Sequence, residues 1–350
     1  MRVIDGLKGL AFSGLMASSL ASAAAEQVPL RQDIKDWTVA CDNTRQCTAI
    51  NGTAETFSIR LIREAGPQGK VQLSLFSYLT PRSAPELDGH ALKAVLTQSR
   101  TYGEEGISDS PERWTASGDQ ALALINELRN GTQLAFATDA AELGSSLSGL
   151  SAALLLIDSV QGRLGSQGAF VRRGPQPDSV GVPPAPAMPT LPMFRTPAPL
   201  SQADSERIAN AVATATRSDW QTAPDDSDPP LIKTYPLTDS TALVYINTPC
   251  GLNCAYWIYQ APRAHPGQAQ PVKLDIPPFN DEESATVGGA HYQPDTGVLT
   301  ISQTGGGMGG GMVTEWQFDG ERFKVRRFAQ LTRTAGIAQE NWPVLFRAGR

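Results

Sequence analysis

The segment from Gly174 to Leu200 constrains the fold more than any other part of the chain, because it holds nine of the 26 prolines. Proline fixes φ and lacks a backbone donor, so neither a helix nor a central strand is expected to continue through it. An extended, polyproline-like linker is predicted instead. A chain of 350 residues is long enough for two domains, and we place them at 26–173 and 201–350, on either side of the linker 174–200. The alternative is that the prolines form a ligand for an aromatic-lined groove on another protein.

The first half mixes strands and helices. Short runs in which apolar and polar side chains alternate predict strands, and these runs are Trp37–Cys41, Ser58–Ile62, Val71–Tyr78, Gln133–Ala137 and a closing strand at Ala169–Arg172. Apolar positions at helical spacing predict two helices. One is capped by Asp119, and the other starts at Ser145 or Ser148 and ends near Gly162. Strands followed by helices indicate the α+β class.

The second half is predicted to begin with a helix capped by Ser201 and then to be mostly β. The strand patterns are Leu231–Leu237, Ala242–Ile246, Tyr256–Tyr259 and Val272–Ile276. Two hairpins follow, with turns at Pro294–Gly297 and at Asp319-Gly320. The whole chain is therefore predicted to be α+β, with mainly antiparallel sheets in both domains and two helices in the first.

The N-terminal residues 1–25 have the pattern of a secretory signal peptide. Arg2 and Lys8 make the start positive, and an apolar stretch runs from Gly9 to Leu20. Small residues follow as two overlapping A-x-A cleavage sites, which place the mature start at Ala24 or Glu26. The apolar stretch is shorter than the ~20 residues that a membrane-spanning helix needs. We therefore expect export to the periplasm or beyond and no membrane span after cleavage, the alternative being a buried N-terminal helix.

The cysteines Cys41, Cys47, Cys250 and Cys254 are predicted to form disulfides, because an even number in an exported protein usually does so. We predict local pairing, Cys41 with Cys47 and Cys250 with Cys254, since each bond then stays within one domain. The alternative is a four-cysteine metal site. Zinc sites favour short C-x2-C pairs, which these spacings do not provide, so no metal is expected.

Charge argues against a nucleic-acid partner. The chain has a net charge of −6, with only 18% charged residues, and phosphate binding requires clustered Lys and Arg. The densest basic run holds Arg322, Lys324, Arg326 and Arg327. Its spacing is typical of the solvent-facing side of a strand.

Motifs for catalysis or cofactor binding are not found. His90, His265 and His291 lack metal-ligand spacing, and there is no G-x-S-x-G elbow. The glycine-rich run 305–311 contains a literal G-x-G-x-x-G, but a strand rather than a helix is predicted after it, so we interpret it as a hairpin loop. No catalytic residue, cofactor or metal ligand is therefore assigned. A site assembled in space from distant segments would leave no such motif.

Several stretches together resemble the domain-of-unknown-function 1176 family of exported bacterial proteins. They are Asp36–Arg45 with Cys47, Ser148–Asp158 running into Gln161-Gly162-Arg163, Glu315–Gly320 with Phe323, and Trp342-Pro343. The Trp37–Cys41 strand is also remotely similar to invasion-associated locus B proteins. The resemblance implies export and an envelope role, and it brings no catalytic residues.

The chain also departs from the family pattern. The resemblance implies that members often carry cysteines near the positions of Gly310 and Thr334, and Cys254 is additional here, so the family's disulfide pairing cannot be copied. Within the second stretch, Arg163 is a candidate ligand contact, because its guanidinium can hold a carboxylate or phosphate through two hydrogen bonds. The alternative is structural: Gly162 ends a helix and Arg163 offsets the helix dipole.

These observations favour a non-enzymatic envelope protein that binds another envelope protein or a cell-wall component. Two other functions remain open. One is an enzyme inhibitor that acts through a disulfide-braced loop at Cys250–Cys254, and the other is a hydrolase whose site is assembled in space.

Overall fold

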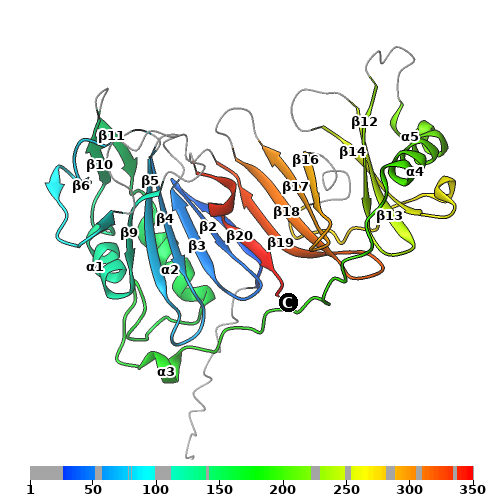
Figure 1. Ribbon diagram of the computed structural model, residues 1–350. Helices are drawn as coiled ribbons and strands as arrows, with labels where there is room; N and C mark the ends of the chain where they lie inside the picture. Colours follow the sequence, from blue (N-terminus) through cyan, green and yellow to red (C-terminus); the bar gives the residue numbers. More distant parts are fainter. Residues whose placement is uncertain are drawn as a thin grey trace, which may run out of the picture.

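The computed structural model shows a chain of several sheets flanked by helices (Figure 1). The described residues are 27–51, 57–77, 79, 81–98, 112–138, 142–221, 229–248, 254–280, 288–304, 310–333 and 337–349. They form four sheets with antiparallel strand pairing, which confirms the predicted mainly antiparallel architecture. No helix within these ranges is both long and apolar enough to cross a membrane.

The first half is built on a seven-stranded sheet in the order β1-β2-β3-β4-β5-β9-β8. Its strands are β1 (Leu30–Ile34), β2 (Trp37–Cys41), β3 (Cys47–Asn51), β4 (Phe57–Arg63), β5 (Val71–Ser77), β9 (Glu112–Ser117) and β8 (Thr97–Gln98). A small second sheet, in the order β11-β10-β6-β7, continues this half. It consists of β11 (Glu142–Ser146), β10 (Gln133–Ala137), β6 (Glu86–Leu87) and β7 (His90–Ala91).

Two helices are found in the segments where the sequence predicted them, and both cover one face of the large sheet. They are α1 (Gly118–Leu128) and α2 (Leu150–Val160). Alternate side chains of the strands, such as Trp37 and Val39, meet Leu124 of α1 and Leu154 of α2 in one buried core. The period of two along each strand thus places one set of apolar side chains against the helices.

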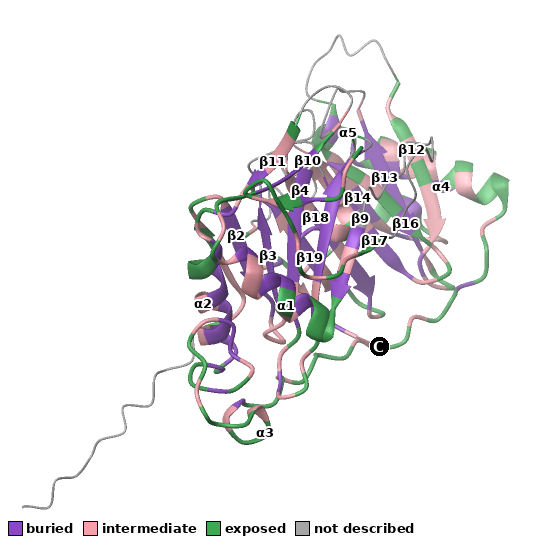
Figure 2. Ribbon diagram, turned by 90° about the vertical axis from the view of Figure 1, so that its left-hand side faces the viewer, coloured by how far each residue is buried: buried purple, intermediate pink, exposed green. Residues whose placement is uncertain are grey.

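The opposite face of the same sheet is also buried, and here the covering residues come from the second half of the chain. Ile50 and Phe76 form a core cluster with Val313, Leu331 and Trp342. The short 3-10 helix Gln339–Asn341 lies there too, since the Arg60 guanidinium donates to the carbonyl of Asn341 at 3.2 Å. Consequently every residue of β2 and β3 is buried, and Figure 2 shows these strands in purple.

The second half contains two sheets that pack against each other. One has the order β12-β13-β14-β15 and the other β16-β17-β18-β19-β20. Their bounds are β12 (Leu231–Pro236), β13 (Thr241–Asn247), β14 (Tyr256–Pro262), β15 (Gln270–Pro271), β16 (Gly289–Gln293), β17 (Val298–Thr304), β18 (Gly311–Phe318), β19 (Phe323–Leu331) and β20 (Val344–Arg347). Tyr245, Tyr292, Trp316 and Phe323 lie in the core between them.

Helix α4 (Gln202–Ala215) and the short α5 (Arg217–Trp220) cover the outer face of the β12–β15 sheet (Figure 1). The predicted cap of the first of these helices is confirmed, because the Ser201 hydroxyl accepts a hydrogen bond from the Asp204 N–H at 3.1 Å. Both predicted hairpins are also found. One joins β16 to β17 and the other joins β18 to β19.

The proline-rich segment is extended over most of its length but is not a free spacer. After the short helix α3 (Asp178–Gly181), residues 182–200, which we call the strap, run along the lower edge of the molecule to α4 in Figure 1. The Leu191 N–H donates to the Gly349 carbonyl at 2.8 Å, and the Gly349 N–H donates to the Pro189 carbonyl at 2.8 Å. The Gln317 side chain donates to the Pro192 carbonyl at 2.7 Å. The strap is therefore bound to the β16–β20 sheet.

Two predicted strands are wrong. Ala169–Arg172 is not a strand, because the N–H groups of Phe170 and Val171 donate to the Asp158 carboxylate at 3.0 Å each instead of to a neighbouring strand. In Val272–Ile276 the pairing is reduced to one parallel bridge between Leu274 and Phe323.

The predicted helix caps in the first half are also wrong. Neither Ser145 nor Ser148 caps α2, which follows Gly149 at φ 97°. The Ser145 hydroxyl is buried and donates to the Asn51 side chain at 2.9 Å. Asp119 lies inside α1, whose first residue is preceded by Ser117.

Candidate binding site

A groove opens beside the strap, on the edge of the β16–β20 sheet, and we call it the strap groove. Its volume is about 800 Å³. One wall is the strap at 189–192, and the opposite wall is the loop 275–278. Lys324 and Val325 of β19 form the floor together with Phe346 of β20.

The groove exists because the outer edge of β19 is paired at both ends but open in the middle. At one end the Phe323 N–H donates to the Lys273 carbonyl, and the Asp275 N–H donates to the Phe323 carbonyl, both at 2.9 Å. At the other end the Ala348 N–H donates to the Arg326 carbonyl at 2.8 Å. The edge between these contacts, at Lys324 and Val325, faces the groove.

The walls are mostly apolar and contain four prolines. Pro189 and Pro192 stand on the strap side, and Pro277 and Pro278 on the loop side. Ile276 is 39% exposed at the loop wall. Since Pro has no N–H and a fixed φ, these walls present stiff apolar surface with few donors of their own.

The charged groups at the rim are already paired. The Asp275 carboxylate lies 3.3 Å from Arg322 and 3.5 Å from Lys324. The Asp319 carboxylate accepts hydrogen bonds from the N–H groups of Glu321 and Arg322 at 2.9 Å each, closing its own turn. Both acidic side chains therefore stabilise the rim, and two of the four basic residues predicted to face solvent, Arg322 and Lys324, form ion pairs with Asp275.

A second, smaller hollow of about 340 Å³ lies further along the strap. It is lined by the strap at 193–197, the turn 237–240 and the turn 318–320. Asp319 borders both hollows. Met193, which is 87% exposed, borders this one. The two hollows thus follow one another along the strap and meet at Asp319.

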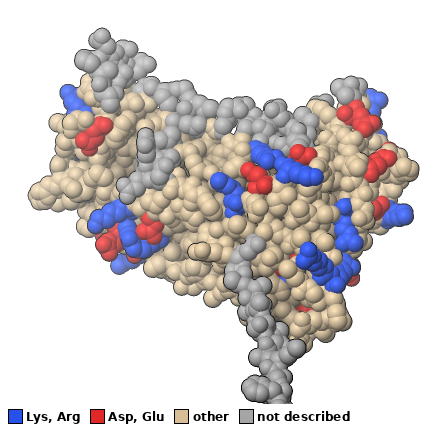
Figure 3. Space-filling view, turned by 180° about the vertical axis from the view of Figure 1, so that it is seen from behind, with Lys and Arg blue, Asp and Glu red and all other residues tan. Residues whose placement is uncertain are grey.

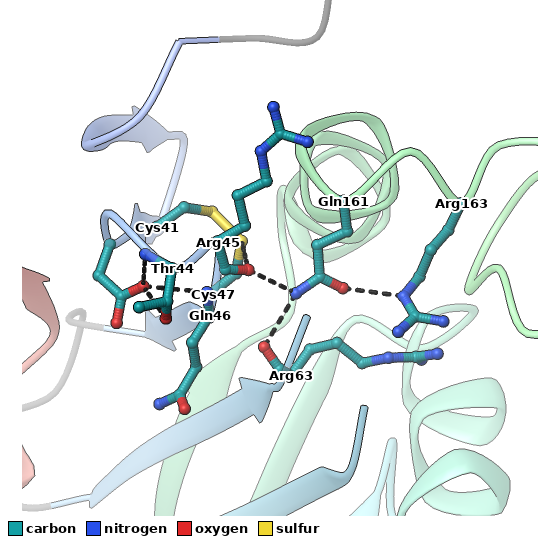
Figure 4. The surroundings of a disulfide bond; sticks show 9 residues. Cys41, Thr44, Arg45, Gln46, Cys47, Arg63, Gln161 and Arg163 are labelled. Atoms are coloured by element: carbon teal, nitrogen blue, oxygen red, sulfur yellow. Dashed lines mark hydrogen bonds between the residues drawn. A yellow bond between two sulfur atoms is a disulfide. The ribbon is translucent and has the colours of Figure 1, made fainter. Parts of the chain in front are cut away.

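The disulfide Cys41–Cys47 is present and joins the facing ends of β2 and β3 (Figure 4). Between the two cysteines, one oxygen of Asp42 accepts hydrogen bonds from the N–H groups of Thr44 at 2.8 Å and Gln46 at 3.0 Å. The predicted local pairing is confirmed for this bond. Cys254 is itself disulfide-bonded, but Cys250 lies outside the described residues, so their pairing stays a prediction.

Next to the disulfide, Gln161 connects three segments of the first half, as Figure 4 shows. Its side-chain amide donates to the carbonyls of Arg45 at 2.8 Å and Arg63 at 2.9 Å. Its oxygen accepts from Nε of Arg163 at 2.9 Å. The side chain of Gln161 is buried, so these bonds replace its hydration and tie the β2–β3 turn to the end of α2.

Arg163 lies at the end of α2, where the structural alternative of the sequence analysis placed it. Gly162 has φ 65°, and the Arg163 N–H donates back to the Asp158 carbonyl at 2.7 Å, which is the hydrogen bond of a Schellman motif. The Arg163 guanidinium is fully buried; it donates to Asp178 at 3.0 Å and to the Gly66 carbonyl. A ligand would have to displace these partners, so a ligand contact at Arg163 stays a prediction.

Two further charges are buried beside Arg163. Burial, with a contribution from the charge of Arg163, lowers the pKa of Arg63 to about 10. Burial likewise raises the pKa of the Asp158 carboxyl, although its hydrogen bonds with the Phe170 and Val171 N–H groups oppose the shift. The Arg63 guanidinium also lies over the Phe170 ring at 4.5 Å. This cluster is closed to solvent and holds the loop after α2 in place.

The other residues singled out in the sequence are dispersed. His90, His265 and His291 are exposed and belong to different sheets or loops. Within the described ranges, no three His, Cys, Asp or Glu side chains are grouped as a metal site. Residues 305–309 of the glycine-rich run lie outside the described part, and the strand β18 follows them, as expected. In Figure 3, charges of both signs lie close together in small groups, separated by uncharged surface.

Sequence reasoning missed the strap groove. The proline pattern of the strap predicts a spacer, and no motif in the sequence around Pro277-Pro278 indicates a site. A signal was available in the Ile276–Phe279 stretch, where two apolar side chains flank two prolines and are both more than a third exposed. Only the fold brings this stretch opposite the strap.

Fold and groove define an α+β protein of mainly antiparallel sheets, whose two halves are joined by a proline-rich strap. The chain belongs to the DUF1176 family, described as "Protein of unknown function", whose model matches residues 31–349. The chain is 28% identical to the "Uncharacterized protein YpfG" of Escherichia coli (strain K12), over 96% of this chain and 97% of that protein. No solved structure matches it. The remote similarity to invasion-associated locus B proteins stays a prediction from the Trp37–Cys41 strand alone.

Proposed function

We propose that this protein is exported to the bacterial envelope and acts there without catalysis, by binding another envelope component in the strap groove. Export is supported by the signal-peptide pattern of residues 1–25. It is also supported by the buried Cys41–Cys47 disulfide, because disulfides persist in oxidising compartments.

The strap groove is the observation that carries the binding role. An accessible hollow with stiff apolar walls is the usual form of a ligand site, and its volume of about 800 Å³ lies in the range of such sites. Its walls are fixed before any ligand arrives, because the strap is hydrogen-bonded to Gly349 and Gln317. A preformed site loses little conformational entropy on binding.

The rim favours binding over acid–base chemistry. Asp275 is held between two cations, and Asp319 accepts hydrogen bonds from its own turn. For Asp319, burial opposes the shift but the hydrogen bonds from the Arg322 and Glu321 N–H groups lower the pKa of its carboxyl, and a carboxyl with a lowered pKa is a poor proton donor. The residues of the groove are therefore suited to hold a partner rather than to transform it.

Site-specific crosslinking in living cells tests the proposal. A photoreactive amino acid at Ile276 in the groove is expected to give a defined crosslinked product in the envelope fraction. The same residue at Val95, which is 65% exposed in the first half, is the matched control and should not give that product. Equal products from both positions, or none from Ile276, would argue against the groove as the binding site.

Export is tested on the same material. Protein purified from the envelope fraction should begin at Ala24 or Glu26 when its N-terminus is sequenced. An intact Met1 on that protein would disprove the cleaved signal peptide.

A further inference from the structure

We infer that the occupant of the strap groove is an extended polypeptide, which adds its backbone to the open edge of β19 at Val325. This inference rests on the proposed binding function of the groove and names the class of ligand. It follows from the hydrogen-bonding groups on the groove floor, the prolines in the walls and the pairing of the rim charges.

The position of the open edge follows from the pairing of β19. One side of this strand is taken by β18, in the register Phe318↔Phe323, Gln317↔Lys324 and Trp316↔Val325. The contacts with Lys273 and Asp275 at Phe323, and with Ala348 at Arg326, must therefore lie on the other side. Between these contacts that side of the strand carries no partner strand in the described part of the chain.

The backbone of Val325 points into this gap. Along a strand, successive residues direct their N–H and C=O groups to alternate sides. Phe323 directs both groups away from β18, since its N–H donates to Lys273 and its carbonyl accepts from Asp275. Val325, two residues further along, does the same, and within the described ranges neither of its backbone groups has a hydrogen-bond partner. The register of the β18–β19 ladder shifts directly after this position, from Trp316↔Val325 to Glu315↔Arg327, so the extra residue Arg326 turns its carbonyl to the same side, toward Ala348. The groove floor thus presents one free donor and one free acceptor, as a pairing strand requires.

Prolines prevent the protein from closing the gap with its own chain. After Asp275, which still bonds to Phe323, the two residues Pro277 and Pro278 cannot donate to β19. On the opposite wall the strap is already committed to Gly349 through Pro189 and Leu191. The free groups of Val325 are therefore left for a separate chain, in the manner of strand addition to an exposed sheet edge.

The chemistry of the rim indicates what kind of peptide fits. Within the described part of the rim, the two positive charges of Arg322 and Lys324 are balanced by the two negative charges of Asp275 and Asp319, so the rim has no excess charge that would favour an ionic ligand. Its walls, formed by Ile276 and the prolines, complement uncharged apolar side chains. A lipid chain would suit the walls equally well but would leave the N–H and C=O of Val325 unpaired, which is unfavourable.

The test uses the full mature protein and a peptide selected on it. Uncharged hexapeptides displayed as a random library are enriched on the wild-type protein, and the best is synthesised for calorimetry. The peptide is then N-methylated at one residue at a time. We expect methylation at the residue that pairs with Val325 to weaken binding about tenfold or more, and methylation at the next residue, which faces away, to have little effect. Hydrogen exchange at the Val325 amide should slow when the unmodified peptide is bound.

The variant Ile276→Asp, which places a charge in the wall, separates this inference from the proposed function. If the variant abolishes peptide binding but the position of the methyl group makes no difference and Val325 exchange is unchanged, the groove binds and strand addition is wrong. If no peptide is enriched while the crosslink at Ile276 captures a lipid or a glycan, the peptide assignment is wrong and the binding function stands. Peptides that bind Ile276→Asp as well as wild type would overturn both.

Discussion

Gly162 shows how one residue connects the helix end to the strap. Its φ of 65° allows the α2 chain to turn back, and a Cβ at this position would lie 2.9 Å from Cδ of Pro183. Gly165 is the matched control, because it has φ 81° and a Cβ added there would meet no atom within 4 Å. Both Gly→Ala changes carry a left-handed backbone penalty of roughly 1–2 kcal/mol.

We expect Gly162→Ala to lower the free energy of unfolding more than Gly165→Ala, by about 1 kcal/mol or more, because only Gly162 abuts the strap. Urea denaturation of the two variants measures the difference. Equal losses would indicate that Pro183 moves aside freely and that the strap is loosely held at this point.

Asp158 links stability to pH. Burial raises the pKa of its carboxyl above the unfolded value, so the native protein binds this proton more tightly than the unfolded chain does. The contribution of Asp158 to the free energy of unfolding is therefore greatest below the unfolded pKa and falls as pH rises through the folded pKa.

Asp158→Asn removes this dependence and one of the two acceptors for the Phe170 and Val171 N–H groups. We expect a loss of roughly 1–3 kcal/mol, larger near pH 4 than near pH 7. Denaturant titrations of wild type and variant at several pH values check both the size and the trend. A loss that grows with pH would mean that the two N–H bonds outweigh burial in setting this pKa.

Among the elements, the β2–β3 hairpin is stabilised twice, by a covalent bond and by its turn. The Cys41–Cys47 disulfide closes a short loop, and Asp42 accepts hydrogen bonds from Thr44 and Gln46 within it. We expect the double variant Cys41→Ala/Cys47→Ala to fold but to lose about 2 kcal/mol, the entropy expected for a loop of this length.

Denaturation without reductant measures this loss. The control is Thr44→Val, which keeps the disulfide and removes only the hydrogen bond from the Thr44 hydroxyl to Asp42, and which should cost less. Failure of the double variant to fold would show that the disulfide is needed to form the hairpin, and no loss at all would show that the turn alone suffices.

A comparison of individual strands, hairpins and helix caps shows why some of them could be predicted from the sequence and others could not. The hairpins β16–β17 and β18–β19 and the Ser201 cap are set by residues close in sequence. The strand expected at Ala169–Arg172 failed because the carboxylate of Asp158, from the preceding helix, takes the N–H groups a strand would have used. An alternating pattern of apolar residues indicates which side chains are buried. It does not indicate which groups form hydrogen bonds with the backbone.

For the whole molecule, the face of the large sheet that carries Ile50 and Phe76 is buried by residues of the second half, including Trp342. Separated halves would expose this apolar surface to water. The boundaries 26–173 and 201–350 thus describe segments of sequence, and their independence stays a prediction that proteolysis can decide.

We expect limited trypsin digestion to cut first after Arg195, which is exposed on the strap, and the two fragments to remain associated. Arg195→Gln, which removes the cleavage site, is the control. Size-exclusion chromatography without denaturant distinguishes the outcomes. Two separate fragments, each still folded, would show that the shared core adds little to the stability of either half.

The sequence by itself determined most of the strands that it predicted, the two helices of the first half, the hairpins, the local Cys41–Cys47 bond and the resemblance to the family that the chain belongs to. Each of these depends on periodicity, turn residues or spacing within a short stretch. Only the tertiary structure decided that Arg163 is buried against Asp178, that the proline-rich segment is bound to Gly349, and that β19 keeps an open edge at Val325. These features depend on which distant segments supply or withhold hydrogen-bond partners, and that is fixed only when the chain has folded.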